Sequence, residues 1–362
     1  MRMKIRLGKL QFQSIEKNKD QTAEYRNILQ TKPTNIINRV GKSNIKENDI
    51  TGVGSVKISG VEVYIDNCKE NMISITTNRV FDLIMLKFTE VIPYGEKTPL
   101  EVIDEKREIN INLLEFMEKC GLKDKKEARK QLTTELETLY NTSLRWTETR
   151  AIAEKGRKRK VMSEMEYNTR IIDSIGIEKG KIINNNVATI KLNMDMAKYF
   201  TYTGYICPYN MNVLKLSAKT YANPIAKTLL ELANINKNNP KRKFIVTVET
   251  ILKRLDKIRV YESLKRKSGF SRRIIEPLEK AFEELIKENV LESWEYLKAN
   301  GEKFTDEEMG FDADGDYTGE KEIFLKNSED FLKLKILFKF KDYPETQDIN
   351  KKTNNSDKTE EK

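Results

Sequence analysis

The feature that most constrains the fold of this chain is an order of sequence patterns that occurs twice. In each copy, a pattern typical of an amphipathic helix precedes a short alternating segment, a brief helical segment, a long helical segment and a strand that contains a tryptophan. The first copy uses residues 80–88, 108–111, 113–120, 125–140 and the strand around Trp146. The second copy uses residues 225–233, 244–248, 251–255, 274–289 and the strand around Trp294.

Helix, strand, helix, long helix and strand hairpin is the order of elements in a winged helix. The sequence therefore predicts an α+β fold with two tandem winged-helix domains and short antiparallel sheets. The long helix of such a domain fits the major groove of DNA. We expect the domains at residues 71–207 and 208–343, with their boundary at Pro208. Residues 1–70 are expected to be an N-terminal extension, partly strand, and residues 344–362 a disordered tail.

The net charge of the chain favours a polyanionic partner. Its 362 residues include 66 Lys and Arg against 56 Asp and Glu, a formal net charge of +10. Cations that neutralise phosphates release condensed counterions, so this excess is typical of proteins that bind nucleic acid. An AT-rich genome produces the same Lys-rich composition, and the positions of the cations have to decide between the two interpretations.

Two further patterns concern the compartment. No stretch approaches the ~20 apolar residues of a membrane helix, and the first residues lack the apolar segment of a secretory signal. Cys68, Cys120 and Cys207 are far apart and odd in number, which argues against a disulfide framework and for a reducing compartment. We expect a cytoplasmic protein without membrane contact, with the three cysteines buried.

The chain contains no histidine. This excludes imidazole metal sites, Ser-His-Asp and Cys-His catalysis and Cys₂His₂ zinc fingers. It also excludes the paired-histidine metal site of rolling-circle nickases, and the acidic residues form no obvious paired set for two-metal chemistry. We expect no enzyme activity, no metal and no cofactor, and DNA that is bound without being cut.

Cations gather at the start of both long helical segments. In the first segment Glu135 and Glu137 follow a basic start, and in the second a run of glutamates follows. This order opposes the helix dipole and is expected where a helix start meets an anion, although a solvated charged face would show the same residues. The cations are Lys125, Lys126, Arg129 and Lys130 in the first copy, and Lys265, Arg266, Lys267, Arg272 and Arg273 in the second.

A third group of cations follows Trp146 at the tip of a predicted hairpin. Five of the six residues 155–160 are basic, and the sixth is Gly156. This composition is typical of a wing tip that contacts phosphates. The candidate wing residues are Arg157, Lys158, Arg159 and Lys160.

Other segments complete the expected sheets. Residues 55–65 predict two strands bent at Gly60, residues 31–50 a loop, and residues 169–177 and 187–192 strands. Residues 332–341 alternate between apolar residues and lysines, which predicts a closing strand whose lysines protect a sheet edge.

Several of these segments resemble a known family. Residues 76–82, 121–130 and 136–148, with residues 273–281 and 294–296 in the second copy, are similar to plasmid replication initiators of Gram-positive bacteria and their mobile elements. The resemblance covers roughly residues 75–342 and leaves the N-terminal 70 residues unplaced. It implies two winged helices that bind repeated sites in the double-stranded DNA of a plasmid origin, with recruitment of a host helicase or initiator and exchange between monomer and dimer. It also implies DNA contacts by the cations at the start of both long helices.

Two other classes fit the same residues. A transcriptional regulator or a partition-type adaptor would bind DNA through winged helices without initiating replication. A regulator would bind a promoter palindrome, because dimer symmetry is mirrored in its site. A structural phage or plasmid protein would bind DNA through its basic surface, equally on all sequences.

Overall fold

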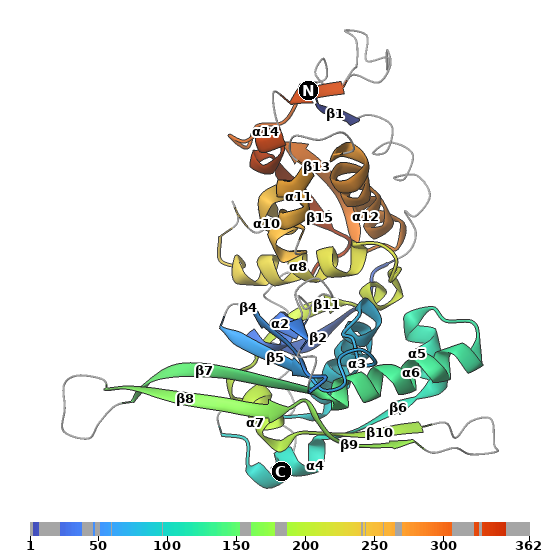
Figure 1. Cartoon of the computed structure of the whole chain (residues 1–362), viewed down its shortest axis with the longest axis vertical. Helices are drawn as coiled ribbons and strands as arrows, with labels where there is room; N and C mark the ends of the chain where they lie inside the picture. Colours follow the sequence, from blue (N-terminus) through green and yellow to red (C-terminus); the bar gives the residue numbers. More distant parts are fainter. Residues whose placement is uncertain are drawn as a thin grey trace, which may run out of the picture. The chain divides into compact units, whose positions relative to one another are not determined.

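The computed structural model describes residues 3–6, 22–37, 46–47, 51–58, 60–95, 97–152, 161–177, 187–239, 242, 244–255, 257–264, 270–305, 322–325 and 328–344. The chain forms two compact units. We call Asn27–Cys207 the first unit, and Met1–Arg26 with Pro208–Lys362 the second unit. Both combine helices with small sheets of antiparallel strands (Figure 1), which confirms the predicted α+β class.

A buried helix forms the centre of the first unit. Helix α3 (Ile75–Val91) has buried residues on every face, because residues 76–86 are buried without interruption. Helix α6 (Lys125–Tyr140) packs against α3 and against α5 (Leu113–Cys120). Gly121 ends α5 in the left-handed conformation, with φ +66°, which a glycine adopts without a Cβ penalty. The predicted helices at 113–120 and 125–140 are confirmed.

The first unit contains two main sheets. One has the order β6-β10-β9, from strands β6 (Glu108–Asn112), β10 (Val187–Leu192) and β9 (Ile172–Ile177). The other has the order β3-β4-β5-β7-β8. Its strands are β3 (Lys46–Glu47), β4 (Gly54–Ile58), β5 (Val61–Ile65), β7 (Thr142–Ile152) and β8 (Val161–Arg170).

The hairpin of β7 and β8 therefore belongs to a different sheet from the strand that precedes α5. Strand β7 pairs with β5, so that Trp146 lies opposite Val61. The Trp146 ring stacks on Tyr167 of β8 at 4.7 Å and meets Tyr199 edge-on at 4.9 Å. Tyr199 belongs to α7 (Met194–Thr203), and these aromatic contacts join the hairpin to that helix. Helix α4 (Leu100–Lys106) precedes β6, and strand β2 (Tyr25–Gln30) pairs with β11 (Tyr205–Asn210).

The second unit repeats part of this order. Its sheet has the order β12-β15-β13, so the strand that precedes the short helix pairs with the last strand, as β6 pairs with β10 in the first unit. Trp294 lies on β13 and its ring is 4.8 Å from that of Phe282 on α12. The elements are η2 (Met211–Lys215), α8 (Ala222–Ile235), β12 (Ile245–Thr247), α10 (Val248–Arg254), α11 (Ile258–Leu264), η3 (Ser271–Ile275), α12 (Glu276–Lys287), β13 (Leu291–Leu297), α14 (Ser328–Lys333) and β15 (Lys335–Phe340), with β1 (Met3–Arg6) paired to β14 (Glu322–Leu325).

The second long helix starts with a π-helical turn, η3, which runs directly into α12. The N–H of Glu276 donates to the carbonyl of Ser271, five residues earlier. Pro277 has no N–H and its ring would clash with the carbonyl four residues earlier, and the wider turn removes that conflict. The sequence predicted a start at Ile274. Helical structure begins earlier, with η3 at Ser271, so that Arg272 and Arg273 lie inside it.

Three sequence predictions are corrected by the structure. The expected loop at 31–50 contains the helix α2 (Lys32–Ile37) and the strand β3. Leu332 and Lys333 belong to α14, so the closing strand is shorter than predicted. This strand, β15, lies between β12 and β13, and its lysines do not protect an edge.

The second unit resumes at Pro208, after the first unit ends at Cys207. Pro208 lies within strand β11 of a two-stranded sheet, where a missing N–H is tolerated. The chain therefore passes from one unit to the other within a strand, without a linker at this point.

Candidate nucleic-acid interface

Helix α6 has one buried face and one charged face. Ala128, Leu132, Leu136 and Leu139 are buried, with the spacing of a single helical stripe. Lys126, Arg129 and Lys130 are exposed, and Lys125 is half-buried. Within the part of the chain that the structure describes, the ammonium groups of Lys126 and Lys130 have no carboxylate partner. These two lysines are therefore available to an external anion.

The start of α6 corrects one step of the sequence reasoning. Asp124 is the N-cap, and its side chain accepts a hydrogen bond from the N–H of Glu127 at 2.6 Å. Glu127 itself lies in the first turn, so two carboxylates already complement the positive end of the helix. The positive end of α6 is therefore already complemented by carboxylates, and Lys126, Arg129 and Lys130 lie on the exposed face of the helix.

Cations of the second unit lie on the π-helical turn and on α12. Arg272 and Arg273 are exposed, next to the buried Ile274 and Ile275. Lys280 is exposed two turns further along the same helical segment, and Glu276 is exposed between them. The face is thus mixed in charge, with its cations gathered at the start, as the sequence predicted.

The remaining predicted contacts lie outside the described residues. They are Arg157, Lys158, Arg159 and Lys160, the candidate wing tip, and Lys265, Arg266 and Lys267 before the second long helix. Strands β7 and β8 that flank residues 153–160 do pair, from Ser143 opposite Arg170 to Ile152 opposite Val161. The predicted tail beyond residue 344 is also outside the described residues.

One carboxyl group on α12 faces inward. Glu279 is 6% exposed and lies beside the buried Tyr296 of β13. Burial raises the pKa of Glu279 to about 8, the charges of Glu283 and Glu276 add to the shift, and the Tyr296 hydroxyl opposes it. Sequence reasoning missed this residue, although Glu279 stands four residues after Ile275 and three before Phe282, within the apolar stripe.

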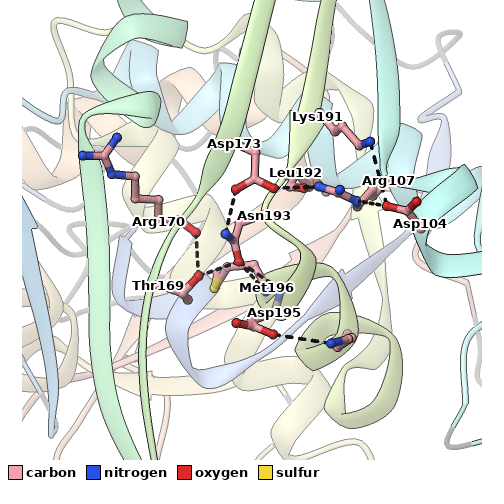
Figure 2. Close-up of polar contacts among 11 residues, drawn as sticks. Asp104, Arg107, Thr169, Arg170, Asp173, Lys191, Leu192, Asn193, Asp195 and Met196 are labelled. Atoms are coloured by element: carbon pink, nitrogen blue, oxygen red, sulfur yellow. Dashed lines mark hydrogen bonds and ion pairs between the residues drawn. The ribbon is translucent and has the colours of Figure 1, made fainter. Parts of the chain in front are cut away.

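A polar network fixes the base of the β9–β10 hairpin (Figure 2). The guanidinium of Arg107 donates to Asp104 and Asp173, both at 2.7 Å, and to the carbonyl of Leu192 at 2.6 Å. Asn193 donates to Asp173 at 2.7 Å and caps α7 by accepting from the N–H of Asp195 at 2.9 Å. The network ties β9, β10 and the segments after α4 and before α7 together. No sequence pattern indicates it, because Arg107 lies 66 positions from Asp173.

The three cysteines are buried thiols, as expected. Among the described residues there is no group of three or more Cys, Asp or Glu side chains that could hold a metal ion. In the same residues no helix is long and apolar enough to cross a membrane.

Comparison with known proteins gives a loose structural likeness. No protein-family profile matches the sequence, and no curated protein matches it. A crystal structure of domains 2 and 3 of RctB, prepared with selenomethionine, aligns over 68% of this chain and 84% of that chain, with 13% identity and a TM-score of 0.36. A second crystal structure of RctB domains 2–3 aligns over 68% and 82%, with 12% identity and a TM-score of 0.34. At these values the likeness leaves the function open.

Proposed function

We propose that this chain is a replication initiator that binds repeated sites in double-stranded DNA through two winged-helix units. One observation carries the proposal: each unit has a strand between two helices, a long helix with exposed cations after them, and a three-stranded sheet in which the first strand pairs with the last. This is the element order of a winged helix, whose long helix enters the major groove. The exposed cations of α6 and the Arg272–Arg273 pair supply the charge for phosphate and base contacts.

The wing of the first unit, in this proposal, is a different hairpin from the one the sequence indicated. In the β6-β10-β9 sheet, β9 and β10 take the positions of the two wing strands. The hairpin of β7 and β8 is then an insertion between the long helix and the wing, and it joins the strands of residues 46–65. The basic residues 157–160 that follow β7 remain a proposed phosphate contact, outside the wing strands.

Initiation, in preference to regulation of a promoter, is supported by the resemblance of five segments to plasmid initiators, residues 76–82, 121–130, 136–148, 273–281 and 294–296. The absence of histidine supports binding without DNA cleavage. Recruitment of a host helicase or initiator belongs to the same proposal, as does exchange between monomer and dimer.

The test is a binding assay on DNA that flanks the gene for this chain. We expect preference for an array of direct repeats, with supercoiled DNA left un-nicked in the presence of Mg²⁺ or Mn²⁺. A single palindrome as the preferred site would favour the transcriptional regulator, and equal affinity for all sequences would favour the structural DNA-binding protein. A nicked product attached to a tyrosine would refute the proposal that the chain does not cut DNA.

Two double variants separate base reading from phosphate binding. Arg272→Ala with Arg273→Ala should cost about 1–3 kcal/mol per base-reading arginine and relax preference at single base pairs. Lys126→Ala with Lys130→Ala should weaken binding to cognate and random DNA alike. Each phosphate that these lysines neutralise accounts for about 0.9 of the slope of log affinity against log salt, so the slope should become shallower by that amount per phosphate. The matched control replaces Lys97 and Lys106, which carry the same charge outside the long helices and should leave both measurements unchanged.

A further inference from the structure

Each unit contains within itself a similar polar contact that the element order alone does not require. In each unit a glutamate of the long helix accepts hydrogen bonds from the segment where the first helix begins. In the first unit this residue is Glu135 of α6, and in the second it is Glu284 of α12. Glu135 precedes Thr142, the first residue of β7, by seven positions, and Glu284 precedes Leu291, the first residue of β13, by seven.

In the first unit the carboxylate binds the capping box of α3. The hydroxyl of Thr77 donates to one oxygen of Glu135, and the hydroxyl of Ser74 lies 3.5 Å from the other. Ser74 is the N-cap and accepts from the N–H groups of Thr76 and Thr77, each at 3.1 Å. Thr77 is fully buried. The carboxylate thus completes the hydrogen bonds of two hydroxyls at the positive end of α3.

In the second unit the contact is made with different donors. The N–H of Ser217 donates to one oxygen of Glu284 at 2.5 Å, and the hydroxyl of Thr220 donates to the other at 2.6 Å. The Thr220 hydroxyl also accepts from the N–H of Ala222, the first residue of α8, at 3.3 Å. The side chain of Tyr221, the N-cap residue of α8, makes no capping hydrogen bond. A bidentate carboxylate therefore holds the turn before α8 from the side of α12.

We infer that Glu135 and Glu284 are positioning residues, an inference that rests on the proposed function. Each glutamate sets the rotation of its long helix about the helix axis, and so the direction in which the cations of that helix face. On α6, Lys126 is nine residues from Glu135, two and a half turns, which places the two side chains on opposite faces. A carboxylate held at two oxygens fixes the inward face against α3 and thereby the outward face. Apolar contacts alone slide more easily, because they lack direction.

The test compares isosteric variants of both partners. Glu284→Gln removes the charge of the carboxylate, and Thr220→Val removes the hydroxyl that donates to it. Thr220→Ser retains the hydroxyl. Glu283→Gln is the matched control, since it removes the same charge from the neighbouring position of α12, and Glu283 has no hydrogen bond to the α8 segment among the described residues. Glu135→Gln, Thr77→Val, Thr77→Ser and the control Glu137→Gln form the same series in the first unit.

Affinities for the cognate repeat and for random DNA are measured at a temperature where circular dichroism shows every variant folded. We expect Glu284→Gln and Thr220→Val to lose roughly tenfold in cognate affinity and less than twofold on random DNA, because charge-assisted hydrogen bonds are the stronger ones. The double variant Glu284→Gln with Thr220→Val should lose no more affinity than either single variant, since the two substitutions remove the same contact. Thr220→Ser and Glu283→Gln should bind as the wild type. Equal losses on both DNAs, or no loss on either, would overturn the inference.

Hydrogen exchange without DNA separates this inference from the proposed function. If the wild type has no preference for cognate DNA, the proposed function fails. Hydrogen exchange then still tests whether Glu284 holds the segment before α8. Glu284→Gln should then speed exchange at residues 217–222 and along α12, and Glu283→Gln should not. Unchanged exchange in Glu284→Gln would refute the positioning role on its own.

Discussion

The buried carboxyl of Glu279 makes the stability of the second unit depend on pH in an unusual direction. Its pKa is raised from 4.5 to about 8 in the folded chain, first by burial. The folded chain therefore keeps a proton that the unfolded chain releases above pH 4.5. The contribution of this carboxyl to stability is greatest below pH 4.5 and falls as pH rises to about 8, at about 1.4 kcal/mol per pH unit. Between pH 4.5 and pH 7 this carboxyl lowers the free energy of unfolding by about 3 kcal/mol.

Glu279→Gln keeps the volume of the side chain and cannot ionise. We expect the variant to match the wild type near pH 4.5 and to exceed it by about 3 kcal/mol at pH 7. In a Trp146→Phe background the remaining tryptophan is Trp294, whose ring lies 4.8 Å from Phe282 of α12, so urea unfolding followed by fluorescence reports on the second unit.

The control, Glu276→Gln, removes an exposed carboxylate of the same helix and leaves Glu279 in place, so the decline of stability with pH should persist. Parallel pH profiles for Glu279→Gln and the wild type would show that Glu279 does not hold its proton, and the burial argument would be wrong.

Two further variants test parts of the fold. Arg107, with 11% of its side chain exposed, donates hydrogen bonds to two carboxylates and a carbonyl. Arg107→Met should therefore lower the free energy of unfolding of the first unit by about 2–3 kcal/mol, measured by Trp146 fluorescence. The control Lys106→Met should change it by less than ~0.5 kcal/mol. Pro277→Ala supplies the missing N–H and should convert the π-helical turn to α-helix. This changes the direction in which Arg272 and Arg273 face and should reduce cognate DNA affinity without loss of charge; unchanged affinity would contradict the role of that turn.

The elements that could be predicted from the sequence are those fixed by neighbouring residues. Helices α5 and α6 begin and end where expected, because Asn112, Gly121 and Asp124 cap them locally and their apolar stripes are continuous. The start of the second long helix was placed too late, because the π-helical turn extends helical structure past the conflict at Pro277 and leaves no periodic signal of its own.

Sheet partners could not be predicted, because pairing depends on residues far apart in the chain. The alternation around Trp146 indicated a strand, but nothing in it showed that Val61 would lie opposite Trp146. The same limit applies to the candidate site. Periodicity placed the cations of α6 on its outer face, whereas the contacts of Glu135 with Thr77 and of Arg107 with Asp173 join residues 58 and 66 positions apart.

Comparison of the two units shows which parts of the repeated order are retained and which vary. The first unit inserts the β7–β8 hairpin between its long helix and the sheet of β6, and the second unit passes from α12 directly to β13. The second unit instead has the additional helix α11 and a π-helical turn before its long helix.

Both units retain the strand before the short helix, its pairing with the last strand, and the glutamate seven positions before the next strand. The retained features all bear on the long helix: the strand and its pairing form the sheet beside it, and we infer that the glutamate sets its rotation. The additions lie at the ends of the long helices, after α6 and before α12. Two units that differ in this way would read DNA by the same element while contacting its backbone with different segments, so we expect exchange of basic residues in those segments to change the affinity of one unit without changing the sequence preference of the other.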